Sequence, residues 1–325
     1  METKAIRQHE HGGVEVLQLE TLDVGAPGPG EVRIRQHACG VNFIDIYHRQ
    51  GLYPLPLPHG LGLEAAGVVD AVGDGVEHVS PGDRVAYVST TPGAYAELRN
   101  LPASFLCPLP DDVSFEDASS IMVQGLTVEL LFNRISPVRA GDTVLFHAAA
   151  GGVGLVACQW ARSEGVRLIG TAGSDEKCAQ ALALGASEMV NYRRSDFVQE
   201  VKRLTDGEGV DVVMDGVGKD TFMGSLDCLR PLGTMISFGN ASGMVPPLDI
   251  MELAVRGSLK VTRPILLKHI GDPDLLAQMS RILFEKMRAG AVVPQIGLKL
   301  GLKDAASAQE KLAARSTMGS IVLTC

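Results

Sequence analysis

The spacing of apolar residues changes along the chain. Up to about residue 125 the apolar positions fall in short, β-rich segments, such as VRIRQHACGV at 32–41, EAAGVVDAVG at 64–73 and DRVAYV at 83–88. Turn signals rich in glycine and proline, such as GAPGPGE at 25–31, separate these segments. Short β-rich segments between such turns predict a compact, mainly antiparallel β domain.

A helix is expected at the end of this first region. Ser114 precedes Asp117 by three residues, which is the spacing of a capping box. The pattern predicts a helix that begins there, runs through Met122 and continues over GLTVELLFNRI to about Ile135.

From Thr143 onward, strand patterns alternate with helix patterns, which predicts a parallel sheet covered on both faces. Six expected strands lie at 143–148, 167–172, 188–192, 210–217, 234–239 and 258–263. After Pro264, two helices and two strands return to the first domain, at 272–290, 295–300, 302–314 and 319–323. We therefore predict an α/β protein with a β-rich domain at 1–125 and 266–325 and a doubly wound Rossmann domain at 126–265.

One glycine cluster carries the first candidate chemistry. The stretch LFHAAAGGVGLVACQWA at 145–161 lies within a charge-free run of nineteen residues, just long enough to cross a bilayer. Glycines in its middle and the lack of basic flanks argue against a membrane span. The cluster falls between a strand and a helix, where backbone amides at a helix N-terminus can hold a pyrophosphate, although small residues there also serve close packing. Its positions are Ala149, Gly151, Gly152, Val153 and Gly154.

The end of the second expected strand indicates which dinucleotide would bind. An NAD site has Asp or Glu there, whereas this chain has Thr171, Ala172, Gly173 and Ser174, which leave room for the 2′-phosphate of NADP. Lys177 and Tyr192 are candidates for contact with that phosphate, and the arginines at 193–194 lie near them in the sequence or the expected fold. The alternative for Lys177 is an exposed helix face, but the missing acid favours contact with the phosphate.

Composition and charge limit the possible partners. The chain has 325 residues, 46% hydrophobic and 21% charged, with a formal net charge of −9. This balance disfavours nucleic-acid and anionic-membrane surfaces, which need clustered Lys and Arg. The first residues lack a signal-peptide pattern, and the six cysteines never occur as C-x-x-C, so we expect reduced thiols and a cytoplasmic location.

Several motifs in this order resemble a known family. GVNFIDIYHRQGLYP, GLGLEAAGVV, GLTVELL, HAAAGGVGLVACQWA, SFGNASG and VTRP are similar to those of the NADPH-dependent quinone oxidoreductases, the zeta-crystallin-like branch of the medium-chain dehydrogenases/reductases. The resemblance covers the whole chain. It implies a GroES-like β-rich catalytic domain in front of the Rossmann domain, NADPH as cofactor, a small quinone or enone as substrate, and a homodimer joined through edge strands near SLKVTR.

The resemblance also implies that no metal takes part. The zinc ligands of the related alcohol dehydrogenases fall at Asn42, Leu63 and Val123 of this sequence, and these residue types do not form a zinc site. Oxidation of an alcohol usually needs a Lewis acid or a tuned base. A quinone or α,β-unsaturated carbonyl needs less help, because conjugation spreads the charge that its oxygen receives.

Candidate catalytic residues lie in the first motif. Asn42 can contact the reactants, or it can cap a helix with Asp45 at the third position; both readings stay open. The resemblance implies that Asn42, Tyr47 and Tyr53 line the substrate and nicotinamide site, although a tyrosine there can also be a packed aromatic.

The resemblance assigns the other cofactor contacts. It places around the nicotinamide half Thr127, Gly152, Val153, Phe238, Gly239, Asn240, Thr262, Arg263 and Pro264. It also brings Arg315 to the 2′-phosphate, whereas a surface charge at a helix end is the alternative. The resulting hypothesis is an NADPH-dependent quinone reductase. The alternative is a non-catalytic NADPH-binding protein with a structural, crystallin-like role or an RNA-binding role.

Overall fold

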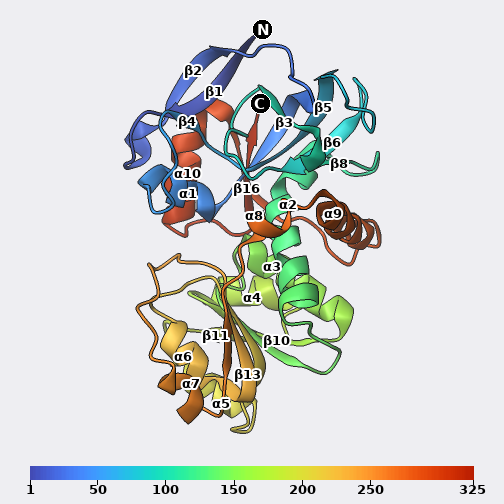
Figure 1. The fold of residues 1–325 in the computed structure, drawn as a ribbon. Helices are drawn as coiled ribbons and strands as arrows, with labels where there is room; N and C mark the ends of the chain where they lie inside the picture. The colour runs from blue at the N-terminus through green and yellow to red at the C-terminus, as the bar shows by residue number, and fades with distance from the viewer. The chain divides into compact units, whose positions relative to one another are not determined.

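The computed structural model describes residues 1–325, which form two compact units (Figure 1). Unit 1 comprises Met1–Leu126, Leu267–Arg288 and Pro294–Cys325, and unit 2 comprises Thr127–Leu266 and Ala289–Val293. The first division falls within one helix, α2 (Phe115–Glu129), and another falls within α8 (Leu266–His269). No helix is long and apolar enough to cross a membrane.

Unit 1 is built on two mainly antiparallel sheets, as the short β-rich segments predict. Its strands are β1 (Glu2–Gln8), β2 (Gln18–Asp23), β3 (Glu31–Val41), β4 (His59–Gly60), β5 (Glu64–Val72), β6 (Arg84–Val88), β7 (Leu98–Pro102), β8 (Leu106–Pro108), β15 (Ile296–Gly301) and β16 (Ser320–Thr324). Its helices are η1 (Val14–Val16), α1 (Phe43–Gln50), η2 (Ala103–Phe105), α9 (Pro273–Arg288), η4 (Leu302–Asp304) and α10 (Ala305–Ala313). The larger sheet has the order β15-β16-β3-β5-β6-β8, with β7 also paired to β3, so the C-terminal strands pair directly with the N-terminal region.

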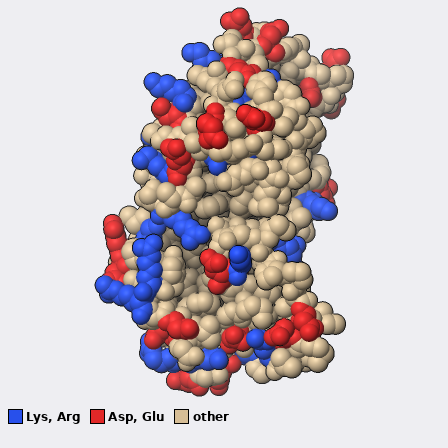
Figure 2. Space-filling view, turned by 90° about the vertical axis from the view of Figure 1, so that its left-hand side faces the viewer, with Lys and Arg blue, Asp and Glu red and all other residues tan.

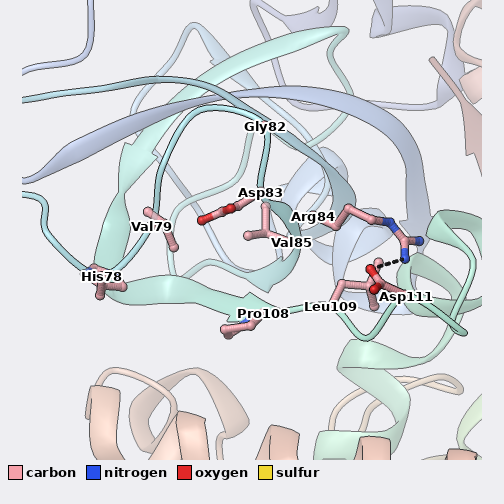
Figure 3. A pocket seen from close by; sticks show the side chains of 9 residues that line it. All are labelled: His78, Val79, Gly82, Asp83, Arg84, Val85, Pro108, Leu109 and Asp111. Atoms are coloured by element: carbon pink, nitrogen blue, oxygen red, sulfur yellow. Dashed lines mark ion pairs between the residues drawn. The ribbon is translucent and has the colours of Figure 1, made fainter.

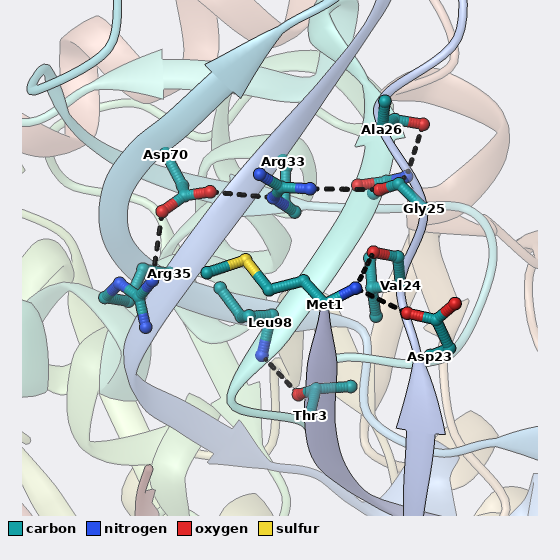
Figure 4. Close-up of polar contacts among 11 residues, drawn as sticks. Met1, Thr3, Asp23, Val24, Gly25, Ala26, Arg33, Arg35, Asp70 and Leu98 are labelled. Atoms are coloured by element: carbon teal, nitrogen blue, oxygen red, sulfur yellow. Dashed lines mark hydrogen bonds and ion pairs between the residues drawn. The ribbon is translucent and has the colours of Figure 1, made fainter.

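Strand β3 shows why this sheet forms. Apolar and polar residues alternate along its first half, and Val32 and Ile34 are fully buried in the core. Arg33 and Arg35 take the other positions, and both bind Asp70 of the neighbouring strand β5, at 2.7 and 3.0 Å (Figure 4). The guanidinium of Arg33, with that of Arg35, lowers the pKa of the Asp70 carboxyl group. Opposite charges on adjacent strands therefore help to fix the register.

Unit 2 is a doubly wound fold with one parallel sheet, which confirms the predicted fold class. The sheet has the order β11-β10-β9-β12-β13-β14, and every neighbouring pair is parallel. Its strands are β9 (Thr143–Phe146), β10 (Arg167–Ala172), β11 (Glu188–Asn191), β12 (Val210–Asp215), β13 (Leu229–Ser237) and β14 (Lys260–Thr262). Its helices are η3 (Leu130–Ile135), α3 (Gly152–Glu164), α4 (Asp175–Ala183), α5 (Phe197–Leu204), α6 (Phe222–Asp227) and α7 (Met251–Val255).

The helix predicted to run to Ile135 changes type before it ends. Ser114 Oγ accepts a hydrogen bond from the Asp117 N–H at 3.0 Å, as the capping box predicts, and α2 follows. The α-helix ends at Glu129 and continues as the π-helix η3. Arg134, five residues beyond the buried Glu129, donates to its carboxylate at 2.8 Å, and a spacing of five residues suits the wider π turn.

Candidate cofactor and substrate site

The glycine cluster forms the connection between β9 and α3. Gly151 is the N-cap of α3 in an extended conformation; its position offers no side-chain cap, and the first turn contains no acidic residue. The positive end of the helix dipole is therefore not neutralised by the protein, which suits an anion. A Cβ added at Gly154 would lie 2.5 Å from both Ala148 O and Ala149 Cα, so the helix also packs closely on the loop. Close packing and an anion-binding geometry coexist here.

A buried polar network holds this loop against the next strands. His147 binds Thr171 Oγ1 through Nδ1 at 3.0 Å and Ser225 Oγ through Nε2 at 2.9 Å. Ser225 in turn donates to Asp215, whose carboxylate also accepts backbone N–H bonds from residues 217–218. Burial lowers the pKa of His147, although Asp215 opposes this effect. The network joins the carboxyl ends of β9, β10 and β12, and its members were not among the predicted site residues.

The end of β10 combines small residues with cations. Ser174 caps α4, because its Oγ accepts the backbone N–H of Lys177 at 3.3 Å. A Cβ at Gly173 would lie 2.6 Å from the hydroxyl of Tyr192 and 3.5 Å from Nε of Arg193, so both side chains reach this glycine. Tyr192 is 43% exposed. A glycine, a hydroxyl group and a guanidinium thus gather where an NAD site would carry an acid.

An acidic residue, Asp175, does follow this position, but its carboxylate is paired with a cation and an amide. Asp175 accepts a hydrogen bond from Asn191 Nδ2 at 2.6 Å, and its second oxygen lies 2.6 Å from Nη1 of Arg194. Arg194 is therefore engaged by Asp175. Arg194 was predicted to lie near the phosphate, but its pairing with Asp175 was not predicted.

The loops after β12, β13 and β14 also meet at the carboxyl edge of the sheet. Arg263 donates to Ser237 Oγ and to the Gly239 carbonyl oxygen, each at 2.9 Å. The ring of Phe238 packs against that of Phe146 at the end of β9, with centroids 5.7 Å apart. Unit 2 thus brings together at this edge the predicted residues Ala149, Gly151, Gly152, Val153, Gly154, Phe238, Gly239, Asn240, Thr262, Arg263 and Pro264. Thr127 also belongs to unit 2, within α2.

Asn42, at the start of α1, has two partners in unit 1. Asp45 accepts the backbone N–H of Asn42 at 2.8 Å, as one half of the predicted capping box requires. The side-chain amide donates to Glu64 Oε1 at 2.6 Å, and Glu64 Oε2 accepts the Val123 N–H at 2.6 Å. Burial raises the pKa of Glu64 to about 8 and that of Asp45 to about 7. Glu64 is therefore part of the candidate site, although it was not among the predicted site residues.

The two candidate tyrosines differ in exposure. Tyr47 is buried on α1, whereas Tyr53, just beyond the helix, is 36% exposed. Their rings meet edge to face with centroids 5.3 Å apart. His48 is also buried, which lowers its pKa to about 4, and Arg49 donates to Gln309 at 2.9 Å. Arg49 therefore holds α1 against α10. Arg315 follows α10, is exposed, and has a left-handed φ of 53°.

The positions that hold zinc in alcohol dehydrogenases do not fit a metal here. Leu63 is buried and apolar, Val123 offers a backbone N–H, and Asn42 turns its amide nitrogen to Glu64. No group of three or more His, Cys, Asp or Glu side chains is arranged to hold a metal ion. The donor set of a zinc site is thus missing from these positions.

A hollow of about 520 Å³ in unit 1 lies apart from the predicted residues. It is lined by His78, Val79, Gly82, Asp83, Arg84, Val85, Pro108, Leu109 and Asp111 (Figure 3). Its polar groups already have protein partners: Arg84 binds the carbonyl oxygen of Pro110 and lies near Asp111, and Asp83 accepts the N–H of Ser80. Arg84 and Asp83 of this hollow are therefore already engaged by the protein.

Charged side chains of both signs are spread over the face shown in Figure 2, and Lys and Arg side chains also form one contiguous blue group at the middle left. The formal net charge of the whole chain is −9.

Two family models match the chain. One, described as an alcohol dehydrogenase GroES-like domain, matches residues 28–111, and the other, described as a zinc-binding dehydrogenase, matches residues 152–285. Together with the two units of the fold, they define a medium-chain dehydrogenase/reductase. The second description mentions zinc, but the residues at 42, 63 and 123 do not fit that metal.

The chain is also similar over nearly its whole length to characterised proteins. The quinone oxidoreductase of Pseudomonas aeruginosa is 48% identical, with 98% of this chain and 99% of that protein covered. The crystal structure of Escherichia coli quinone oxidoreductase complexed with NADPH is 45% identical, with a TM-score of 0.97, 99% of this chain and 100% of that chain covered. The 2-haloacrylate reductase of a Burkholderia species is 42% identical, with 97% of each chain covered. The chain belongs to the quinone oxidoreductase family, which confirms the family predicted from the sequence.

Proposed function

We propose that this protein is an NADPH-dependent quinone oxidoreductase that reduces quinones or α,β-unsaturated carbonyls without a metal. The observation that supports this proposal most directly is the structure at the end of β10. There Gly173, Tyr192 and Arg193 meet, and Asp175 forms an ion pair with Arg194. Relatives named quinone oxidoreductase and a neighbour solved with NADPH support the proposal. No comparison favours the non-catalytic alternative.

Residues of unit 2 would hold the cofactor. The first turn of α3 offers its helix dipole to the pyrophosphate, with Gly151 and Gly154 keeping the loop close to the helix. Ser174, Lys177 and Tyr192 would surround the 2′-phosphate. When bound, NADPH supplies the hydride that a quinone accepts.

Residues of unit 1 would hold the acceptor. Tyr53 offers an exposed phenol whose ring rests on the buried Tyr47, so its position is defined by packing. Asn42 offers a fixed amide. An acceptor that is already electrophilic needs positioning and one or two hydrogen-bond donors. The 2-haloacrylate reductase among the relatives supports including unsaturated carbonyl compounds in the substrate class.

We also propose a homodimer joined through β14 and a cytoplasmic location. Strand β14 lies at the edge of the parallel sheet, and exposed apolar residues lie on or near it, including Met251, Val255 and Val261. An unpaired edge strand with apolar neighbours favours pairing with a second copy.

Cofactor and substrate preference test the proposal directly. We expect oxidation of NADPH by a simple benzoquinone, at least tenfold weaker binding of NADH, and no loss of activity with a chelator. Lys177→Glu should weaken NADPH binding about tenfold and leave NADH binding unchanged, because only NADPH carries the 2′-phosphate. Lys202→Glu, on the exposed face of α5, is the matched control. Equal affinities for both nucleotides, or activity that disappears with the chelator, would overturn the proposal.

A further inference from the structure

The side chain of Glu64 bridges two elements that carry the candidate site. It extends from β5 and is fully buried. One carboxyl oxygen binds the amide nitrogen of Asn42 at the start of α1, and the other binds the backbone N–H of Val123 in α2, each at 2.6 Å. The carboxyl group therefore joins three segments that lie far apart in the sequence.

The carboxyl group has little freedom to move. A Cβ at residue 40 of β3 would collide with the Glu64 carboxyl group and with the carbonyl oxygen of Ser119, so only a glycine leaves room for them. The backbone of Glu64 pairs with Val88 in the sheet. Both ends of the side chain are thus fixed, one by the ladder and the other by two hydrogen bonds and tight packing.

Asn42 is held from two sides as a result. Asp45 fixes its backbone N–H, and Tyr95 donates to the same Asp45 oxygen at 2.8 Å. Glu64 fixes the amide nitrogen. Because an amide has its donor and acceptor on opposite branches of one planar group, binding the nitrogen also sets the direction of the carbonyl oxygen.

We propose that Glu64 is a positioning residue, which fixes the orientation of the Asn42 amide so that Asn42 meets the bound reactants in one arrangement. This inference rests on the proposed function, in which Asn42 contacts the cofactor or the acceptor. Glu64 acts through Asn42 and does not itself contact the reactants.

A double-mutant cycle tests whether Glu64 acts through Asn42. Glu64→Leu and Asn42→Ala should each lower kcat/KM for a quinone about tenfold, and the double variant should be no worse than Asn42→Ala alone. Glu64→Gln keeps an oxygen for the Asn42 amide and should restore most of the activity. Glu129→Gln removes another buried carboxylate, which pairs with Arg134, and its effect should multiply with that of Asn42→Ala. Effects of Glu64→Leu and Asn42→Ala that multiply in the double variant would overturn the proposal.

A second readout does not depend on turnover. It is the NMR signal of the Asn42 side-chain amide in the protein without cofactor, assigned by its loss in Asn42→Ala. The two amide protons should have well-separated chemical shifts and exchange slowly with solvent. In Glu64→Leu the chemical shifts of these protons should approach those of a free asparagine amide. An unchanged signal would overturn the proposal. If Glu64→Leu does not fold, Glu64→Asp is measured instead, since its shorter side chain cannot reach both donors.

The two hypotheses fail differently. If Asn42→Ala leaves both kcat/KM and NADPH affinity unchanged, the role proposed for Asn42 is wrong and so is the inference built on it. If Asn42→Ala impairs either quantity but the cycle is multiplicative, only the role of Glu64 is wrong.

Discussion

Replacing Gly154 by alanine separates two physical effects that oppose each other. In a helix interior alanine is favoured over glycine by about 1 kcal/mol, so helix propensity alone predicts a more stable protein. The structure predicts the opposite. The new Cβ would lie 2.5 Å from Ala148 O and 2.5 Å from Ala149 Cα. Since comfortable contacts begin near about 3.5 Å, the loop or the helix must move by about 1 Å.

The loss in the free energy of unfolding caused by this movement can be given an order of magnitude. Overpacking costs about 1–3 kcal/mol, and here the contacted atoms are backbone, which cannot rotate away. After the propensity gain, we expect a net destabilisation of up to about 2 kcal/mol, which lowers the melting temperature by up to about 8 °C for a domain of this size. The displaced loop should also weaken NADPH binding about tenfold or more.

Gly151→Ala provides the matched comparison. The nearest atom to its new Cβ is Ala148 O at 3.2 Å, and its φ of −80° is open to alanine. We expect a loss of about 0.5–1 kcal/mol in stability, because alanine is a poorer N-cap residue than glycine, and little change in NADPH binding, because the loop is not pushed off the helix. Thermal unfolding and fluorescence titration of NADPH measure both variants. A Gly154→Ala protein that melts at or above the wild-type temperature and binds NADPH normally would refute the close-approach reasoning.

Three further predictions follow from the structure. Arg194→Ala frees the Asp175 carboxylate and should weaken NADPH binding about threefold with little effect on NADH, and adding Asp175→Ala should reverse this; titration of the single and double variants checks it. Burial raises the pKa of Glu64 from 4.5 to about 8, so between these values the folded state binds one proton more than the unfolded state and stability falls as the pH rises. Melting temperatures should therefore fall between about pH 5 and 8 and level off above, less steeply in Glu64→Gln; equal slopes would contradict this. Val261→Lys on β14 should give a monomer in sedimentation, whereas Leu182→Lys on α4 should not, and a Val261→Lys dimer would exclude the edge-strand interface.

The sequence predicted those features that depend on residues close together in the chain. The alternation of strands and helices gave the parallel sheet, because period and turn chemistry are local properties. The Ser114–Asp117 cap spans three residues and was also predictable. The change to a π-helix after Glu129 was not, because it accompanies a five-residue ion pair that helix periodicity does not encode.

The candidate site was predictable only in part for the same reason. Asn42 and Asp45 are three residues apart, so their pairing could be predicted from the local pattern. The partner that holds the Asn42 side chain, Glu64, lies 22 residues away. His147 likewise meets Ser225, 78 residues away, and that distance carries no periodic signal. An isolated Glu64 within the apolar stretch GLGLEAAGVV was the one hint available, since carboxylates are rarely buried without partners.

The replaced zinc positions show why these distant partners matter. A buried carboxyl group without donors is costly, and here two donors come from positions that would otherwise carry metal ligands, Asn42 and Val123. Cysteine at 42 would remove one of these donors, and the buried Leu63 would still offer no ligand. A single substitution toward a zinc site therefore leaves Glu64 short of a hydrogen bond without creating a metal site. The amide at 42 and the acid at 64 therefore depend on each other: the buried acid needs a hydrogen-bond donor at 42, and the amide needs an acceptor at 64.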